Sequence, residues 1–154
     1  RWPGHIPKGG VTNEIVHIAD IFPTVARIVG ADIPGDRIID GVDQLDFFTG
    51  KQEQSSRDGF VFYIKSEMRA VKWRDWKMHM VWEEEVNDGA IKLESPYLFN
   101  LIQDPKEETN VALEHSWVAA HMRRMVHDFL EGLKRYPPIP PGTADPYEPP
   151  NSAK

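Results

Sequence analysis

Carboxylates and imidazoles are the side chains that first suggest chemistry in this sequence, because its 154 residues include no cysteine. The lack of cysteine excludes a cysteine nucleophile, a thiolate zinc site and a disulfide bond. Asp40 and Asp43 flank Gly41, and Glu83–Glu85 form an acidic run, but neither group has the spacing of a calcium-binding loop. Asp-Gly pairs are typical of turns and acidic runs are typically solvated, so we interpret both groups as structural.

The histidines show no metal-binding or catalytic motif. They are scattered along the chain, without an H-E-x-x-H motif and without a pair four residues apart. His79 lies between two methionines in a segment that has strand character. We therefore expect His17 and His79 to be hydrogen-bonded, structural histidines. The other four histidines are His5, His115, His121 and His127.

Binding sites for nucleotides, nucleic acids and membranes are not indicated either. The chain has no G-x-G-x-x-G motif and no Walker A spacing, and its formal charge of -6 disfavours non-specific binding to a phosphate backbone. Trp73, Trp76 and Trp82 lie among basic residues, and we interpret them as hairpin and core packing rather than as a stacking platform for bases. The longest apolar runs are far shorter than the ~20 residues that cross a bilayer.

Length and composition predict one globular domain with a self-supporting core. The chain begins with Arg1, and no apolar signal segment follows, so we expect a fragment of a longer protein.

The first part of the chain is predicted to form an irregular loop and two helices. The loop is rich in proline and glycine and has an aromatic anchor at Trp2. A helix is expected between Asp20 as N-cap and Gly30 as the residue after its end, and a shorter one between Asp43 and Gly50. The longer helix has an apolar stripe, which should pack on an apolar surface and consists of Ile21, Val25, Ile28 and Val29.

The middle of the chain is predicted to form an antiparallel sheet. Three runs rich in β-branched and aromatic residues are separated by short polar segments whose lengths fit hairpin turns. A fourth run follows an acidic, glycine-containing loop, Glu83–Glu94. The expected strands are Phe60–Ile64, Met68–Trp73, Lys77–Trp82 and Tyr97–Ile102.

The last regular segment has the apolar period of an amphipathic helix and should cover one face of this sheet. The expected fold class is α+β, with a small four-stranded antiparallel sheet covered by a C-terminal helix. We expect residues 1–136 to form one subdomain with a Pro-rich tail at 137–154. The subdomain would comprise a linking loop and helices at 1–58, the sheet at 59–102 and the covering helix at 116–135.

Six segments, in this order, resemble the C-terminal part of the sulfatases, most closely the arylsulfatase type. These enzymes hydrolyse sulfate esters and belong to the alkaline-phosphatase-like superfamily. The resemblance covers about residues 1–113, and its order and spacing are more specific than any one segment. The segments are RWPGHIPKGG, VHIADIFPTVARIVGA, IDGVDQLDFFTGK, GFVFY, AVKWRDWKMH and LFNLIQDPKEETN.

The resemblance implies that the catalytic residues lie in a domain outside this chain. Sulfatases use a formylglycine made from a Cys or Ser in a C/S-x-P-x-R motif, a calcium ion held by Asp and Asn, and Lys, His and Arg groups that bind the sulfate. That machinery lies in the larger N-terminal catalytic domain. This chain has no C/S-x-P-x-R motif, no Asp-Asp pair and no Asp-Asn pair, so no catalytic or metal-binding residue is assigned to it. We expect the chain alone to be inactive.

The same resemblance implies a partner and a set of candidate residues. In intact sulfatases the C-terminal subdomain packs against the catalytic domain, and its loops can form part of the rim of the substrate pocket. The implied rim candidates are Lys65 and Glu67 in the first hairpin turn, His79, and the Glu83–Glu94 loop. Without that partner, the apolar face of the first helix and Trp2 should be exposed and should drive self-association.

Two other interpretations of the sequence stay open. The chain could be a stand-alone binding or scaffold module that has the sulfatase C-terminal fold without its chemistry. The parent protein could also cleave phosphate or phosphonate esters, because relatives with those activities share this architecture and differ in a metal site outside this chain.

Overall fold

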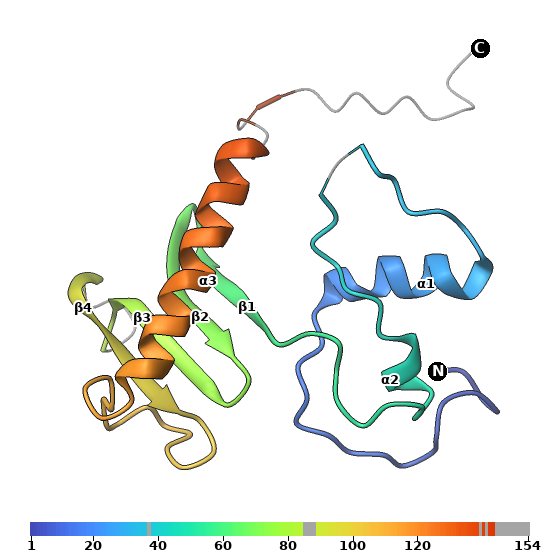
Figure 1. Ribbon diagram of the computed structural model, residues 1–154, viewed down its shortest axis with the longest axis horizontal. Coiled ribbons are helices and arrows are strands. Elements are labelled where there is room, and N and C mark those ends of the chain that lie inside the picture. The colour runs from blue at the N-terminus through green and yellow to red at the C-terminus, as the bar shows by residue number, and fades with distance from the viewer. Residues whose placement is uncertain (37, 85–88, 139, 141, 144–154) are drawn as a thin grey trace.

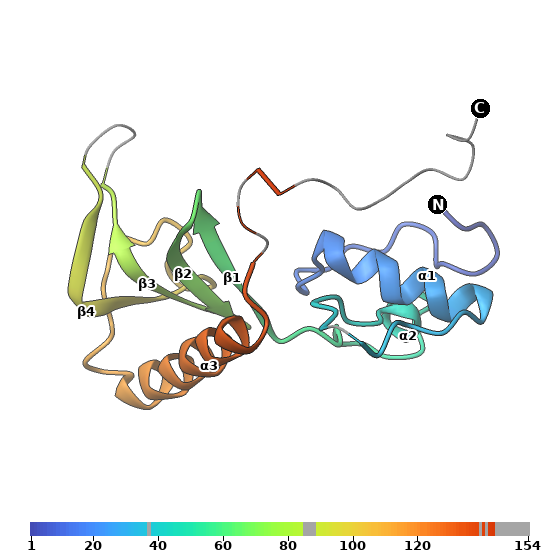
Figure 2. The ribbon, with the colours of Figure 1, turned by 90° about the horizontal axis from the view of Figure 1, so that it is seen from above.

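The computed structural model describes residues 1–36, 38–84, 89–138, 140 and 142–143 (Figure 1). The chain forms two parts, a first half of residues 1–58 and a sheet half of residues 59–136, joined by the segment that precedes the first strand (Figure 2). In the part of the chain that the structure describes, no helix combines the length and apolar character needed to cross a membrane.

The sheet half contains the predicted four-stranded antiparallel sheet. Its strands are adjacent in the order of the sequence, β1-β2-β3-β4, so each strand pairs with the one before it. The first three agree with the sequence prediction to within one residue, but the fourth starts at Ile91 instead of Tyr97, because Ile91 and Lys92 pair with Trp82 and Val81. The strands are β1 Gly59–Ile64, β2 Glu67–Trp73, β3 Trp76–Trp82 and β4 Ile91–Asn100.

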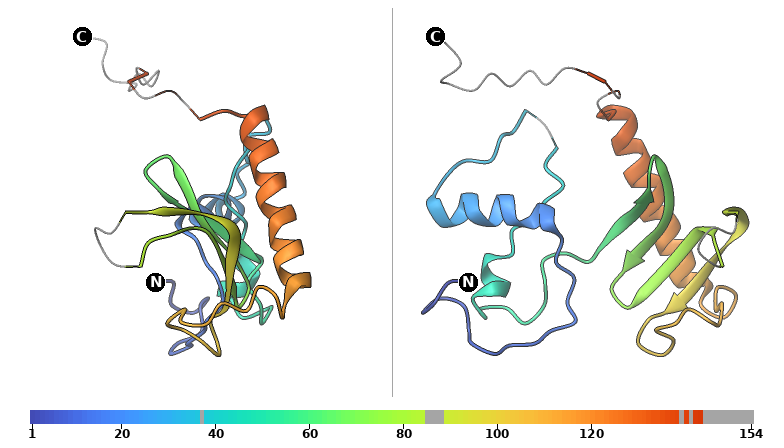
Figure 3. Two further views of the ribbon diagram at one scale, coloured as in Figure 1. Left: turned by 90° about the vertical axis from the view of Figure 1, so that its left-hand side faces the viewer. Right: turned by 180° about the vertical axis from the view of Figure 1, so that it is seen from behind.

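The helix α3, Ser116–Arg135, lies along one face of this sheet, as the two views of Figure 3 show. Apolar side chains from β2, β3 and β4 meet one stripe of the helix, and together they exclude water from the core. The expected α+β class with a covering helix is therefore confirmed. The fully buried core residues are Val71, Met78, Leu98, Val118, Ala119 and Met122.

The strand register shifts at two neighbouring places in the sheet, once between β1 and β2 and once between β3 and β4. Phe62 pairs with Ala70, but Tyr63 pairs with Met68, so Arg69 is an extra residue of β2 with no partner on β1. In the other pair of strands, the register between β3 and β4 shifts after His79, which is itself paired with Ala70. Bulges bend a strand and redirect side chains, and they are common next to functional sites.

The first half contains a turn of 3-10 helix, η1 Ile18–Asp20, and two helices, α1 Ile21–Val29 and α2 Leu45–Phe48. Gly30 ends α1 with φ 68°, which confirms its predicted role, because a left-handed residue at this position favours glycine. The short helix α2 follows Gln44 as its N-cap rather than the predicted Asp43. Asp43 instead accepts a hydrogen bond from the backbone of α2, at 2.9 Å from Leu45 N to Asp43 Oδ1.

Asp20 occupies the predicted position before α1, but its side chain does not cap the helix. The carboxylate turns inward and is fully buried, and it accepts hydrogen bonds from the Arg57 guanidinium at 2.9 and 3.0 Å. The backbone N–H groups of His17 and Val42 donate to it at 2.8 and 2.9 Å. Burial alone would raise the pKa of Asp20, but these hydrogen bonds and the Arg57 charge outweigh it and lower the pKa to about 2.

Gly41 lets the loop before α2 approach η1 closely. A β-carbon at this position would lie 2.1 Å from the carbonyl oxygen of Ala19 and 2.8 Å from a ring carbon of Pro23. The glycine is therefore required by contact with η1 and α1, and the Asp-Gly turn indicated by the sequence is only part of its role.

The outward face of α1 is apolar. Ile21, Phe22, Val25, Ile28 and Val29 are between 40% and 67% exposed, while the buried residues of the helix are Pro23, Thr24 and Ala26. The predicted stripe is therefore not covered by the rest of the described chain and stays 40–67% exposed. Trp2 is half-buried and stacks on His5, with ring centroids 4.0 Å apart.

Candidate functional site

A groove of about 560 Å³ lies on the sheet half, beside the irregularities described above. We refer to it as the His79 groove. His79 and Trp82 of β3 line it, together with Arg69 of β2 and Glu107 from the segment that follows β4. Because Met78 points into the core under α3, its neighbour His79 points to the opposite face of the sheet.

His79 is held from two sides. Its Nε2 atom lies 2.5 Å from Oε2 of Glu107, and its ring packs edge-on against Phe99 and Trp82 at centroid distances of 5.7 and 5.2 Å. Burial lowers the pKa of His79, the charge of Lys77 lowers it further, and the contact with Glu107 offsets this only in part. The imidazole is therefore neutral near pH 7 and can both donate and accept a hydrogen bond.

Glu107 connects two groups of β3 through its two carboxylate oxygens. Its Oε1 accepts a hydrogen bond from Lys77 Nζ at 2.5 Å, while Oε2 contacts His79. Glu107 has φ 61°, a left-handed conformation that is unusual for a residue with a side chain. Asp104 holds the turn in place by accepting hydrogen bonds from the N–H groups of Glu108 and Thr109 at 3.1 and 2.9 Å.

Arg69 forms a wall of the groove, and its guanidinium is only partly satisfied. Its Nε lies 3.0 Å from Oε2 of Glu67, and its Nη1 lies 3.6 Å from Oε2 of Glu83. The Nε–H group is nevertheless buried and has no aligned hydrogen-bond acceptor among the described residues. Its partner is therefore the Glu67 carboxylate, in an ion pair whose angle is poor for a hydrogen bond.

Trp82 supplies the aromatic surface of the groove. The indole stacks on Phe99 at a centroid distance of 5.6 Å with an angle of 28° between the rings, and Tyr97 packs against it at 5.6 Å. These contacts fix the ring in place, while the side chain stays partly exposed where it lines the groove.

The structure brings two of the three predicted rim residues to this region. His79 lines the groove, and Glu67 lies at its edge, paired with Arg69. Lys65 is exposed in the β1–β2 turn, next to Ile64, which lines the groove, but it is not a lining residue itself.

The predicted Glu83–Glu94 loop is only partly a loop. Glu83 and Glu84 line the groove, residues 91–94 belong to β4, and residues 85–88 lie outside the described part of the chain. Sequence reasoning missed Arg69 and Glu107. Arg69 was missed because the bulge that redirects it has no local sequence signal. Glu107 was missed because its segment, QDPKEETN, indicated only a turn.

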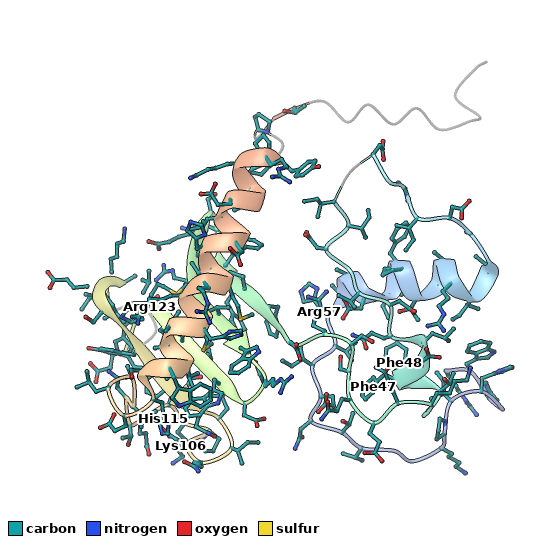
Figure 4. All side chains as sticks on the ribbon, in the orientation of Figure 1. Phe47, Phe48, Arg57, Lys106, His115 and Arg123 are labelled. Carbon is teal, nitrogen blue, oxygen red and sulfur yellow. The ribbon has the colours of Figure 1, made fainter. Side chains whose placement is uncertain are left out.

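The groove presents hydrogen-bonding side chains of both charges. Donors from Arg69 and Lys106 lie beside carboxylates and an aromatic ring. Figure 4 shows Lys106 in the sheet half, away from α1 and α2, and Arg57 at the junction of the two halves. Within the described ranges, no group of three or more His, Asp and Glu side chains is placed to hold a metal ion.

Comparison with known proteins identifies the family. A family model described as the C-terminal region of aryl-sulfatase matches residues 55–140, which is more than half of the chain. Mouse (Mus musculus) steryl-sulfatase is 31% identical over 88% of this chain and 24% of its own length. Human (Homo sapiens) arylsulfatase D is 29% identical over 70% of this chain and 22% of its own length.

Solved structures agree with this assignment. The crystal structure of the PsFucS1 sulfatase from Pseudoalteromonas sp. matches with a TM-score of 0.80 and 26% sequence identity. The match covers 90% of this chain and 30% of that protein. The chain thus spans about a quarter of the length of the curated relatives named above. From the family model and these relatives together, we conclude that the chain belongs to the family of aryl-sulfatase C-terminal regions.

Proposed function

We propose that the chain works as the C-terminal subdomain of a sulfuric ester hydrolase of the arylsulfatase type. In this proposal it packs against an N-terminal catalytic domain of the same polypeptide, lines part of the substrate pocket and has no activity alone. The observation that carries the proposal is the reversed burial of the first half, where a charged pair is buried and the apolar face of α1 is exposed.

The exposed face is large enough to require a partner. Burying one large apolar side chain contributes about 1.5–3 kcal/mol. Burying the five exposed apolar residues of α1 against a partner would therefore stabilise the fold by several kcal/mol, which the described chain does not gain on its own. Contiguous exposed apolar patches mark interaction surfaces. A catalytic domain is the natural partner, because the relatives are about four times as long as this chain.

The chemistry of ester cleavage is assigned to that partner. The chain has no cysteine and no C/S-x-P-x-R motif, and its described residues offer no set of oxygen ligands for calcium. The residues present thus do not fit either formylglycine or calcium, and both groups are proposed to reside in the catalytic domain. The proposed contribution of this chain is the pocket rim, with His79 and Glu67 at the groove and Lys65 beside it.

The relatives favour sulfate esters over the alternatives. The similar proteins named above are sulfatases, which supports cleavage of a sulfate ester rather than a phosphate or phosphonate ester. A stand-alone module would have to tolerate the exposed α1 face, so the reversed burial counts against it.

The test begins with the coding sequence upstream of Arg1. We expect an open reading frame with a C/S-x-P-x-R motif and an Asp-Asp pair. Its full product should hydrolyse para-nitrophenyl sulfate, and the 154-residue chain should not. A stop codon upstream or hydrolysis by the chain alone would overturn the proposal, and a preference for para-nitrophenyl phosphate would support the phosphate ester alternative.

Docking through α1 is tested in the full product. Val25→Glu places a charge in the proposed interface, because Val25 lies on the exposed apolar face. Leu113→Glu is the matched control, since Leu113 is 91% exposed and lies in the sheet half, outside that face. We expect Val25→Glu to reduce hydrolysis and yield strongly and the control to leave both unchanged. Equal behaviour of the two variants would remove α1 from the interface.

A further inference from the structure

The two halves of the chain are joined by the segment 57–59, which Figure 2 shows between them. Two grooves lined by residues of both halves lie next to this segment. One has a volume of about 220 Å³ and lies beside the β2–β3 turn, and the other has about 390 Å³ and lies beside β1 and α3. Arg57 lines both grooves. Because these grooves interrupt the packing between the halves, the joining segment itself must contribute to their relative orientation.

The guanidinium of Arg57 binds three separate segments at this junction. Its Nε and Nη2 atoms donate to the buried carboxylate of Asp20 at 2.9 and 2.5 Å. Nη2 also donates to the backbone oxygen of Asp40 at 2.6 Å. Nη1 donates to the backbone oxygen of Gly59, the first residue of β1, at 3.3 Å. The side chain is largely buried, so these partners hold it in one orientation.

Gly59 transmits this hold to the sheet. It pairs with Trp73 of β2, and a β-carbon on Gly59 would lie 2.1 Å from the carbonyl oxygen of Lys72. The backbone of Gly59 therefore has little room to move against β2. Any change in the position of Gly59 relative to Arg57 should then move the whole sheet half.

The other contacts across the junction are less directional. The Arg74 side chain pairs with Asp58 at 3.3 Å, but both side chains are mostly exposed, and such pairs contribute little. The backbone N–H of Arg74 also donates to the backbone oxygen of Asp58 at 2.7 Å. The rings of His17 and Phe60 meet with centroids 5.8 Å apart. A buried, charged fork restricts orientation more strongly than an exposed pair or a ring contact.

We propose that Arg57 is a positioning residue that fixes the orientation of the sheet half relative to the first half. The inference rests on the proposed function, in which α1 docks on a catalytic domain and the His79 groove forms part of the pocket rim. Arg57 would then set where the rim lies once α1 has docked. This role is separate from neutralising Asp20. A lysine could supply the same charge, but only the planar fork of an arginine can reach oxygens that lie in three directions.

The experiment measures distances between pairs of spin labels on the 154-residue chain by double electron–electron resonance. The chain has no cysteine, so introduced cysteines are the only labelling sites. Glu53→Cys with Arg123→Cys reports the distance between the halves, because both residues are exposed and lie in different halves. Asp32→Cys with Glu53→Cys reports on the first half alone, and Lys92→Cys with Arg123→Cys reports on the sheet half alone. An excess of unlabelled chain suppresses distances between copies.

The test variant is Arg57→Lys, which keeps the charge beside Asp20 and loses the fork. The matched control is Arg74→Lys, the same replacement at the exposed arginine of the junction. We expect one narrow distance distribution between the halves in the unmodified chain and in the control. Arg57→Lys should widen this distribution by about twofold or more, while the distances within each half stay unchanged.

Three results would overturn the inference. The first is a broad or two-peaked distribution between the halves of the unmodified chain, which requires no variant. The second is an unchanged distribution in Arg57→Lys. The third is a widening of the distances within either half in Arg57→Lys, since Arg57 would then only stabilise the fold.

Failure here is distinguishable from failure of the proposed function, because the distances do not depend on hydrolysis. A full product that hydrolyses para-nitrophenyl sulfate, together with an unchanged distribution in Arg57→Lys, would leave the proposed function intact and remove only the positioning role.

Discussion

Replacing Asp20 by Asn tests whether the charged pair at the centre of the first half stabilises it. The substitution keeps the size of the side chain and removes its charge. The Arg57 side chain is only 12% exposed and that of Asp20 is fully buried, so the remaining guanidinium would be buried without a counter-ion. Breaking a buried pair in this way costs about 3–5 kcal/mol, and we expect a loss of that size.

The pH dependence gives a second estimate of the same interaction. The pKa of Asp20 is about 2 in the folded chain, against about 3.9 for a free Asp. Because the folded value is the lower one, the ionised carboxylate stabilises the fold above about pH 4, by roughly 2.5 kcal/mol. This contribution is lost as the pH falls through about 2. Asp20→Asn should remove that pH dependence.

Hydrogen exchange at the Val42 and Gln44 amides provides the assay, because they donate to Asp20 and to Thr24 inside the first half. Asp43→Asn is the control, since its pair with Arg27 is exposed and should contribute less than about 1 kcal/mol.

A double variant separates the charged pair from general damage to the first half. Asp20→Asn combined with Arg57→Met should lose less stability than the sum of the single variants, because no charge is left unpaired. A loss below about 1 kcal/mol for Asp20→Asn, or strict additivity in the double variant, would refute the reasoning.

Three further perturbations probe other parts of the chain. Gly41→Ala should destabilise the first half by about 1–3 kcal/mol in the same exchange assay, because the new β-carbon would lie 2.1 Å from the Ala19 carbonyl oxygen; unchanged exchange would contradict this. The chain alone should self-associate in analytical ultracentrifugation through the exposed face of α1, and Val25→Glu should abolish this; a monomeric unmodified chain would argue against the exposed face as a docking surface. Lys77→Met should raise the pKa of His79 in an NMR titration, because the Lys77 charge lowers it; a lower or unchanged pKa would show that Lys77 has no such effect.

The sheet and its covering helix could be predicted because their signals are local. Each of the first three strands is a short run of β-branched and aromatic residues that ends at a polar turn, and α3 shows an apolar period along its length. The start of β4 could not be predicted in this way. Its first residues pair with Val81 and Trp82 across the intervening loop, and Pro96 interrupts the strand-like pattern.

The candidate site was less predictable than the fold. His79 was identified through resemblance to a family, but the groups that surround it come from a bulge and from a turn with a left-handed residue. The side chain of Asp20 was also misjudged, because a carboxylate before a helix usually caps it. Its actual partner, Arg57, lies 37 residues away in a segment for which neither a helix nor a strand was predicted.

The 37 residues between Asp20 and Arg57 affect when the first half can fold during synthesis. Residues leave the ribosome at about 5–20 per second, so Asp20 waits roughly 2 to 7 seconds before Arg57 follows it. During that interval the Asp20 carboxylate stays hydrated, because Arg57 is not yet available to pair with it. The segment around η1 and α1 therefore cannot form its buried charged pair. Arg57 emerges just ahead of β1. The nascent first half is therefore expected to stay open to proteases and chaperones until the moment when the sheet begins to appear.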